Sequence, residues 1–199
     1  MISCVDNVFE DPKEIIKFAN TLTYTDIGNT RGVRSKHLNE INQELFNFIN
    51  TKILNCFYPG SFYKFFAKSF FQKNEYDIND GWVHSDNGLI TAVIYLTEGG
   101  TAGTSIYEQK DEHQLIEPQD KKHDYFNNHK NYSMIEKQEI QKLKLKNNSL
   151  FNKTVSFTGR FNRLIAFNSK IWHAAELQKP SENRMTLISF IEKVKKHND

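Results

Sequence analysis

The sequence contains only two cysteines, Cys4 and Cys56. Their spacing fits no zinc or redox motif and indicates no disulfide framework, so we expect two free thiols in a reducing compartment. The N-terminus lacks the basic and apolar regions of a signal peptide, and no apolar run approaches the ~18 residues of a membrane span. These absences predict a soluble, cytoplasmic protein without a membrane partner.

Positive charge is sparse as well. The formal net charge is +2 and the chain has no basic stripe, so binding to nucleic acid is not supported. Lysine greatly outnumbers arginine, which makes an arginine within a strand of this chain informative. The only arginines are Arg31, Arg34, Arg160, Arg163 and Arg184.

The composition is that of an ordinary globular protein, with 38% hydrophobic and 25% charged residues, and it excludes a disordered chain. A length of 199 residues suits one domain with one core, so we expect residues 1–199 to form a single domain. Sixteen phenylalanines and eight tyrosines predict a core built on aromatic side chains.

Helical patterns dominate residues 1–60, after a short strand that we expect over residues 2–9. Pro12 fits the first turn of a helix, where proline is favoured. A second amphipathic helix is expected over residues 38–56, because apolar residues recur there at intervals of three and four. Residues 25–37, between the two helices, are typical of a loop. We expect the helices to pack against a sheet.

Patterns typical of strands follow over residues 61–192. Residues 62–71 are rich in aromatic side chains, and residues 89–97 read LITAVIYLT, a buried strand that ends before two glycines. Helices followed by many short strands predict a mainly β, α+β protein or a sandwich with the helices outside. Further strands are expected over residues 104–107, 161–167, 171–177 and 185–192.

A long polar insertion, residues 110–150, interrupts these strands. It contains no glycine, eight lysines and seven acidic residues, and its segment Met134–Leu145 is compatible with a helix. An insertion of this length within a domain is uncommon, and it is either a functional lid over a substrate or a solvated excursion of the surface. The sequence leaves both interpretations open.

His84 and Asp86 carry the first chemical signal. They are two residues apart, and in extended backbone this spacing places both side chains on one face. His173 follows a strand much later in the chain. Two histidines and one carboxylate can occupy one triangular face of an octahedral iron and leave the opposite face open. His-x-Asp alone is a weak signal, because a histidine beside an aspartate is more often a structural hydrogen-bonded pair.

The second half of the pattern, His173 followed by Arg184, makes it more specific. Arg184 lies eleven residues after His173 and opens the apolar strand expected over residues 185–192. A guanidinium can bind a carboxylate through two parallel hydrogen bonds, so Arg184 is suited to hold an acidic co-substrate. His84, Asp86, His173 and Arg184 together predict a metal centre beside a carboxylate-binding arginine.

These residues resemble the motif of the Fe(II)/2-oxoglutarate-dependent dioxygenase superfamily, in which His-x-Asp, a distal histidine and an arginine occur in this order. The likeness covers about residues 60–192 and is to prolyl-hydroxylase-like members. It is closer to a poorly characterised branch with a GT-x-x-Y strand, here Gly103–Tyr107, and an Asn-Arg-Leu strand, here Asn162–Leu164. The resemblance implies a double-stranded β-helix, or jelly roll, with the N-terminal helices packed outside it.

The resemblance also implies roles for individual residues and a reaction. Fe(II) and 2-oxoglutarate would be the cofactor and co-substrate, and O2 the oxidant. Succinate and CO2 would be released while an unactivated C–H is hydroxylated, with desaturation or demethylation as variants. The implied iron ligands are His84, Asp86 and His173, and the implied 2-oxoglutarate contacts are Arg184, Tyr95 and Thr186.

One departure concerns the strand before His-x-Asp, which lacks the tyrosine that often helps to hold 2-oxoglutarate, since Tyr76 falls late. Two rival functions stay open: a cupin-like metal enzyme that does not use 2-oxoglutarate, and a non-catalytic jelly-roll binding module. The substrate, a small molecule or a peptide, is not identified, and neither is the oligomeric state. Trp82 and Trp172 are either pocket walls or core. The remaining histidines, expected at the surface, are His37, His113, His123, His129 and His197.

Overall fold

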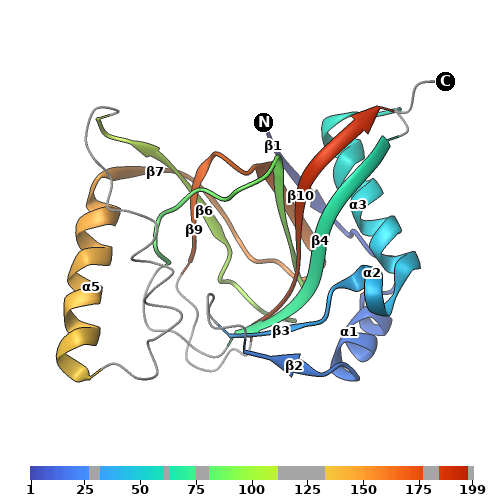
Figure 1. Cartoon of the computed structure of the whole chain (residues 1–199), viewed down its shortest axis with the longest axis horizontal. Helices are drawn as coiled ribbons and strands as arrows, with labels where there is room; N and C mark the ends of the chain where they lie inside the picture. The colour runs from blue at the N-terminus through green and yellow to red at the C-terminus, as the bar shows by residue number, and fades with distance from the viewer. Residues whose placement is uncertain (27–31, 61–62, 75–80, 112–132, 177–183, 197–199) are drawn as a thin grey trace.

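A computed structural model of the chain describes residues 1–26, 32–60, 63–74, 81–111, 133–176 and 184–196. Figure 1 shows a layered arrangement, in which helices α1, α2 and α3 cover one side of a large sheet and a small sheet lies on its other side. Helix α5 stands beyond the small sheet, at the opposite end of the molecule from α1. The fold is the jelly roll with outer N-terminal helices that the sequence predicts.

The large sheet is antiparallel and contains seven strands. Its centre consists of the apolar runs of the sequence, since the central strands are covered on both faces. Two of these runs, residues 90–95 and residues 184–196, pair with each other there. Their register runs from Thr186 opposite Tyr95 to Ile191 opposite Ile90. From edge to edge the strands are β1 (Ile2–Asp6), β8 (Arg163–Asn168), β5 (Ile90–Tyr95), β10 (Arg184–Lys196), β4 (Tyr63–Asn74), β3 (Val33–Ser35) and β2 (Tyr24–Thr25).

The small sheet consists of β7 (Phe151–Phe157), β6 (Thr104–Gln109) and β9 (Trp172–Ala175), in that order. Tyr95 of the large sheet and Ile106 of the small sheet belong to one buried cluster, together with Ile165 and Phe167. The two sheets therefore face each other, and the space between them is the interior of the jelly roll.

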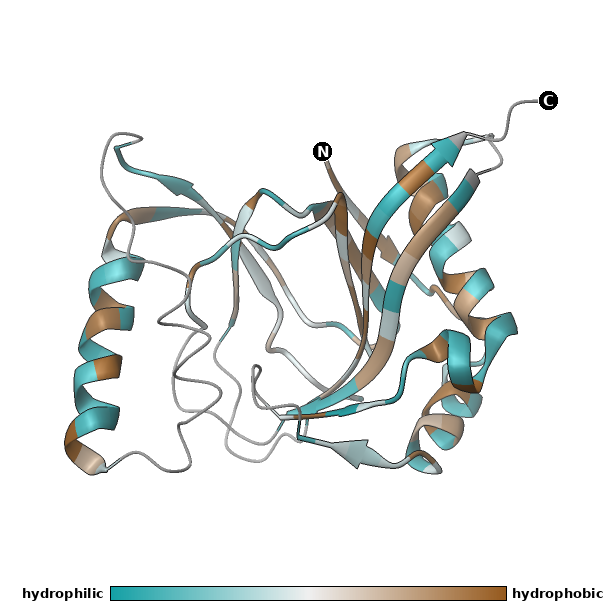
Figure 2. Cartoon of the chain, in the orientation of Figure 1, coloured by the Kyte–Doolittle hydropathy of each residue, from teal (hydrophilic) through white to brown (hydrophobic). Residues whose placement is uncertain are grey.

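Three helices cover the outer face of the large sheet: α1 (Pro12–Asn20), α2 (Leu38–Ile41) and α3 (Gln43–Phe57). Ile49 and Ile53 of α3 are fully buried against Phe71 of β4 and Leu187 of β10. Burying each such side chain contributes about 1.5–3 kcal/mol to stability. Figure 2 shows hydrophobic segments along β4 and β10, and hydrophilic residues at the outer end of β6.

The N-terminal region differs from the sequence prediction in two details. Residues 25–37 contain more than a loop, because β2 and β3 extend the large sheet beyond β4. The helix expected over residues 38–56 is broken at Asn42, which leaves the helical conformation and accepts a hydrogen bond from the backbone N–H of Leu45 at 2.9 Å. This capping interaction starts α3 as a separate helix.

The sequence prediction also missed strand β7. Most of its residues are exposed, so it lacks the alternation of apolar and polar residues that marks a half-buried strand. The other expected strands are present, although the one expected to end at Leu177 ends at Ala175, and Leu177 lies outside the described residues.

The described part of the insertion contains helix α5 (Met134–Ser149), four residues longer than expected. Ser133 and Glu136 form a reciprocal capping box at its N-terminus, which explains where the helix begins. Residues 112–132, with His113, His123 and His129, lie outside the described residues, as do Tyr76 and His197.

The cysteines are both free, with Cys4 exposed and Cys56 partly buried. In the described part of the chain, no helix is both long and apolar enough to cross a membrane.

A buried polar network joins α3 to the large sheet. Asn50, which is fully buried, hydrogen-bonds Ser69 of β4 at 3.0 Å and accepts from Ser189 of β10 at 2.6 Å. Its amide also donates to the carbonyl of Phe46, one turn earlier, at 2.8 Å. Because Ser69 and Ser189 are direct cross-strand neighbours, one side chain fixes the position of the helix on two strands.

We predict that Asn50→Ala lowers the free energy of unfolding by about 2 kcal/mol, since the two serines keep each other but lose their buried partner. Urea unfolding followed by circular dichroism measures the change. The control is Asn47→Ala, one turn earlier on the exposed side of α3. Equal stability of the two variants would contradict a stabilising role for the network.

Candidate metal centre

The segment before and around His84 joins the small sheet as a short extra strand. His84 and His173 exchange two backbone hydrogen bonds, of 3.0 Å and 2.8 Å, and the N–H of Gly81 donates to the carbonyl of Ala175 at 2.8 Å. A side chain at Gly81 would place its Cβ 2.9 Å from the Ala175 nitrogen, so glycine permits this close approach. The pairing brings together two histidines that are far apart in the sequence.

Asp86 completes a cluster with the two histidines. Its Oδ1 lies 3.5 Å from Nε2 of His84, and its Oδ2 lies 3.2 Å from Nε2 of His173. One potential ligand atom from each residue lies within 4.8 Å of the other two. The structure thus brings together the three residues that the sequence nominates as iron ligands, although their role as ligands stays a prediction.

The remaining nitrogen of each histidine determines which tautomer is present. Nδ1 of His84 lies 2.8 Å from the carbonyl of Trp82, and Nδ1 of His173 lies 2.8 Å from the carbonyl of Ile171. A carbonyl only accepts hydrogen bonds, so both Nδ1 atoms carry the proton. In the neutral rings each Nε2 therefore presents a lone pair toward Asp86, which is the arrangement of a metal-binding histidine.

The carboxylate of Asp86 is largely enclosed. The hydroxyl of Thr91 on β5 donates to Oδ2 at 2.9 Å, and the same hydroxyl lies 3.0 Å from that of Ser169. Burial by itself would raise the pKa of Asp86, but hydrogen bonds and charge from His173 and His84 outweigh it and hold the pKa well below its usual range. The carboxylate is ionised, and the positions facing it suit protons on the imidazoles or a cation between neutral rings.

Two imidazoles and one carboxylate are a donor set that fits a divalent transition metal, and iron in particular. The rings of His84 and His173 lie 4.4 Å apart, and Phe167 of β8 packs 4.6 Å from the His173 ring. This packing holds the rings in place before any ion binds, which lowers the cost of assembling the site.

The residues expected to hold 2-oxoglutarate lie farther along the same interior face. Thr186 and Tyr95 are direct cross-strand partners, and the guanidinium carbon of Arg184 lies 5.3 Å from the centre of the Tyr95 ring. Tyr95 shares the face of β5 with Thr91, four residues earlier, which is roughly 13 Å along a strand.

Tyr95 is held firmly within this region. Its hydroxyl is 2.6 Å from that of Thr104 on β6, and burial raises its pKa, against which the positive charge of Arg184 acts. Arg184 is 9% exposed and donates to the carbonyl of Gly103 at 3.4 Å. The GT-x-x-Y segment thus supplies a backbone carbonyl and a hydroxyl to the interior.

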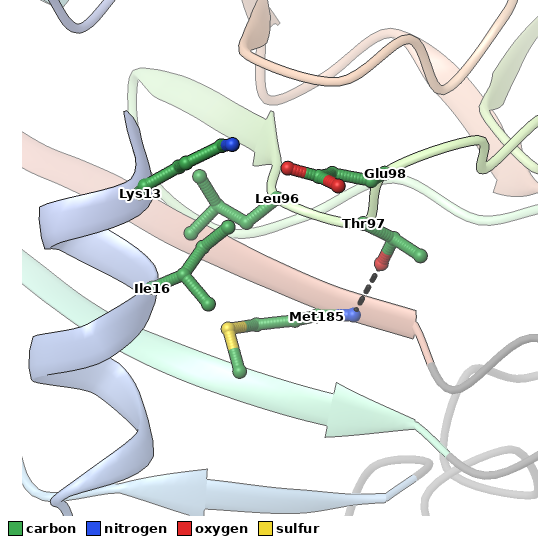
Figure 3. A pocket seen from close by; sticks show the side chains of 6 residues that line it. All are labelled: Lys13, Ile16, Leu96, Thr97, Glu98 and Met185. Carbon is green, nitrogen blue, oxygen red and sulfur yellow. Dashed lines mark hydrogen bonds between the residues drawn. The ribbon is translucent and has the colours of Figure 1, made fainter. Parts of the chain in front are cut away.

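Two hollows lie near the C-terminal end of β5. A small cavity is lined by Tyr95 and Arg184, together with Thr97, Gly100, Ala102 and Gly159. Figure 3 shows an open groove on the helix-covered side, between α1 and the ends of β5 and β10. Thr97 lines both hollows, and its hydroxyl accepts a hydrogen bond from the backbone N–H of Met185 at 2.8 Å. The groove contains no residue of the triad.

The insertion contacts the metal-ligand segment through a pair of asparagines that sequence reasoning missed. Asn148 donates to the carbonyl of Gly81 at 2.9 Å and accepts from the N–H of Val83 at 2.9 Å. Asn147 donates to the carbonyl of Val83 at 3.0 Å. We call these three hydrogen bonds the asparagine clamp. It occupies the edge of this segment that faces away from β9, so α5 replaces a neighbouring strand beside His84.

Arg34 and Gln72 were also missed by sequence reasoning. The sequence predicts a loop around Arg34, whereas Arg34 lies in β3 opposite Gln72 of β4. The scarcity of arginine was the one signal that pointed to it. Trp172 is partly buried, and its ring lies 5.0 Å from that of Phe151, against a buried cluster of Val83, Phe151 and Ala174.

The fold and the triad define a class of protein: a jelly roll with a potential metal site formed by two histidines and an aspartate. The chain belongs to the family of unknown function DUF6445, and the match extends over residues 1–191. No curated protein matches the sequence.

Solved structures with the same fold are 2-oxoglutarate- and Fe(II)-dependent oxygenases. HygX from Streptomyces hygroscopicus, solved with nickel, 2-oxoglutarate and hygromycin B, is 9% identical with a TM-score of 0.57, over 96% of this chain and 83% of that one. A prolyl hydroxylase from Trichoplax adhaerens, in complex with a peptide fragment, is 11% identical with the same TM-score and coverage. SnoN, an epimerase of nogalamycin biosynthesis, is 13% identical with a TM-score of 0.58, over 96% and 78%. At these identities the likeness establishes the fold.

We predict that Asn148→Ala weakens metal binding by about tenfold, because partners of a ligand segment commonly contribute that much to metal affinity. Titration with Co(II), followed by visible absorption, measures the affinity and the coordination geometry. Asn148→Asp keeps the acceptor for Val83 and should bind with intermediate affinity.

The matched control for the clamp is Asn152→Ala, an exposed asparagine on β7. Its Co(II) affinity should equal that of the unsubstituted protein. A Co(II) affinity and spectrum that are unchanged in Asn148→Ala would show that the clamp only anchors the insertion.

Proposed function

We propose that this protein is an Fe(II)- and 2-oxoglutarate-dependent oxygenase that hydroxylates an unactivated C–H bond of its substrate. The observation that carries the proposal is the meeting of two Nε2 lone pairs and an ionised carboxylate, from His84, His173 and Asp86, at one end of the jelly roll. The fold shared with 2-oxoglutarate oxygenases supports it.

In this proposal the triad holds Fe(II) and the protein supplies its surroundings. The backbone carbonyls of Trp82 and Ile171 keep both imidazoles in the ligating tautomer. Thr91 orients the carboxylate of Asp86, and Phe167 excludes water from the His173 side. When bound, iron with 2-oxoglutarate supplies the oxidising chemistry: one atom of O2 ends in succinate, with loss of CO2, and the other in the hydroxylated substrate.

The co-substrate would be held by Arg184, Tyr95 and Thr186. The Arg184 guanidinium would pair with the far carboxylate of 2-oxoglutarate, in a region where burial strengthens such a pair. Thr186, 2% exposed and opposite Tyr95, provides a hydroxyl beside it. Tyr95 packs against the arginine and restricts its movement. These three roles follow from position on the interior face and from the resemblance of the motif.

The substrate class stays open between a small molecule and a peptide, since neighbours with this fold bind hygromycin B or a peptide fragment. The outcome is proposed as hydroxylation, although SnoN is an epimerase, so product analysis has to accompany any assay. We also propose a cytoplasmic location, which the two free cysteines support.

We predict that the protein converts 2-oxoglutarate to succinate in the presence of Fe(II) and O2, slowly without substrate and faster with it. His84→Ala and His173→Ala should abolish both succinate release and Fe(II) binding, because each removes a ligand. Arg184→Met should raise the KM for 2-oxoglutarate by about thirtyfold, the cost of losing one partner of a buried charge pair. Succinate is measured by mass spectrometry and Fe(II) by anaerobic titration.

Arg160→Met is the matched control, since Arg160 is exposed and pairs with Asp6 at the other edge of the large sheet. Succinate release with an unchanged KM in Arg184→Met would remove the arginine from the proposed mechanism. Metal binding without any use of 2-oxoglutarate would favour the cupin-like enzyme, and no metal binding would favour the binding module.

A further inference from the structure

Arg34 shares the interior face of the large sheet with the co-substrate residues. It lies directly opposite Gln72, Gln72 lies opposite Thr186, and Thr186 lies opposite Tyr95. Directly opposed residues of antiparallel strands point to the same face of a sheet. A single row of side chains therefore crosses four strands, with Tyr95 at one end and Arg34 at the other.

Contacts with its neighbours hold the guanidinium of Arg34 in one orientation. Its Nε donates to Oε1 of Gln72 at 2.7 Å, and its central carbon lies 4.2 Å from the centre of the Phe70 ring. The amide of Gln72 in turn donates to Asn74 at 2.8 Å, which fixes the direction of its oxygen. Both Nη atoms are left without a hydrogen bond to any residue that the structure describes. A stacked guanidinium with two parallel donors is suited to a planar oxyanion.

The charge of Arg34 interacts with that of Asp86 in the triad. Burial lowers the pKa of Arg34 to about 10, and the carboxylate of Asp86 acts in the opposite direction. Arg34 therefore stays cationic at neutral pH and lies close enough to Asp86 for the two charges to interact. Of the other charged residues of this face, Lys68 pairs with Glu192 and Arg163 pairs with Asp6.

The carboxylates near the site already have other partners. Asp86 faces the two imidazoles. Glu176, whose charge also acts on Tyr95, accepts hydrogen bonds from the hydroxyl of Ser105 at 2.7 Å and the N–H of Gly103 at 3.3 Å. Neither carboxylate hydrogen-bonds the Arg34 guanidinium, so its two Nη atoms can bind an anion supplied from outside.

We propose that Arg34 binds a carboxylate of the substrate, so that the protein selects a carboxylic acid and holds it across the interior from Tyr95. This inference rests on the proposed function and names the substrate class of the same site. Gln72 and Phe70 are positioning residues that hold the guanidinium in place. Arg184 binds the co-substrate, and Arg34 binds the molecule that is oxidised.

The test uses trifluoroacetate as a carboxylate probe, with the full chain loaded with Mn(II) and saturated with 2-oxoglutarate. Mn(II) at the triad broadens the fluorine resonance of any probe held near it. We expect saturable broadening by the unsubstituted protein, weakened by about tenfold or more in Arg34→Met, as the loss of a bidentate charged pair implies. Arg34→Lys keeps the charge but lacks the two parallel donors of the guanidinium, so its broadening should be intermediate. Trifluoroethanol, which is uncharged, should show no saturable broadening.

Calorimetric titration of 2-oxoglutarate into the same Mn(II)-loaded variants separates the possible outcomes. Arg34→Met should bind 2-oxoglutarate as the unsubstituted protein does, and Arg160→Met should match it in both measurements. Broadening that survives in Arg34→Met would overturn the proposal, because the probe would then bind the metal directly. Loss of 2-oxoglutarate binding in Arg34→Met would also overturn it, by assigning Arg34 to the co-substrate. An unsubstituted protein that binds neither Mn(II) nor 2-oxoglutarate would instead refute the proposed function, and the inference with it.

Discussion

His84 and His173 hydrogen-bond each other through both backbone groups, at 3.0 Å and 2.8 Å. Residues paired in this way lie about 5.5 Å apart and direct their side chains to one face, so the two imidazoles must meet. Asp86 reaches the same place because it follows His84 by two residues in extended backbone. The approach of both imidazoles to one carboxylate depends on this one pairing.

The large sheet separates stability from chemistry by its two faces. Toward the helices it presents a continuous apolar surface, to which Phe71, Ala92 and Leu187 contribute, and a buried polar network around Asn50. Toward the small sheet it presents the apolar cluster of Tyr95, Ile165 and Phe167, and beside it Thr91, Thr186 and the arginines Arg34, Arg163 and Arg184. Because successive side chains of a strand alternate between faces, β5 and β10 serve both purposes at once.

The insertion has a structural connection to the site that its polar composition does not suggest. The C-terminal end of α5 brings Asn147 and Asn148 to the backbone just before His84, where they bind groups that a neighbouring strand would otherwise pair with. A helix that stabilises one edge of the ligand segment, while β9 stabilises the other, leaves His84 little freedom. The part of the insertion described by the structure thus supports the site, whereas the sequence suggested either a lid or a surface excursion.

Sequence patterns were informative where a periodicity was strong. The sequence predicted the apolar runs of β5 and β10, the two amphipathic helices and the spacing of His84 and Asp86. These patterns depend only on residues that are close together in the sequence. Patterns were weak where an element was short or exposed. Strands β2 and β3 contain too few residues for a period, and β7 is too exposed to show one, so all three were missed.

By itself, the sequence determined the class of fold, the set of potential metal ligands and the arginine that could hold a dicarboxylate. Residue types and short spacings carry that information, since metals and carboxylates each require particular donors. Only the tertiary structure decided which nitrogen of each histidine faces Asp86, that Arg34 shares a face with Tyr95, and that α5 holds the segment before His84. Those relations join strands and helices far apart in the chain, and they exist only once the sheets have paired in register.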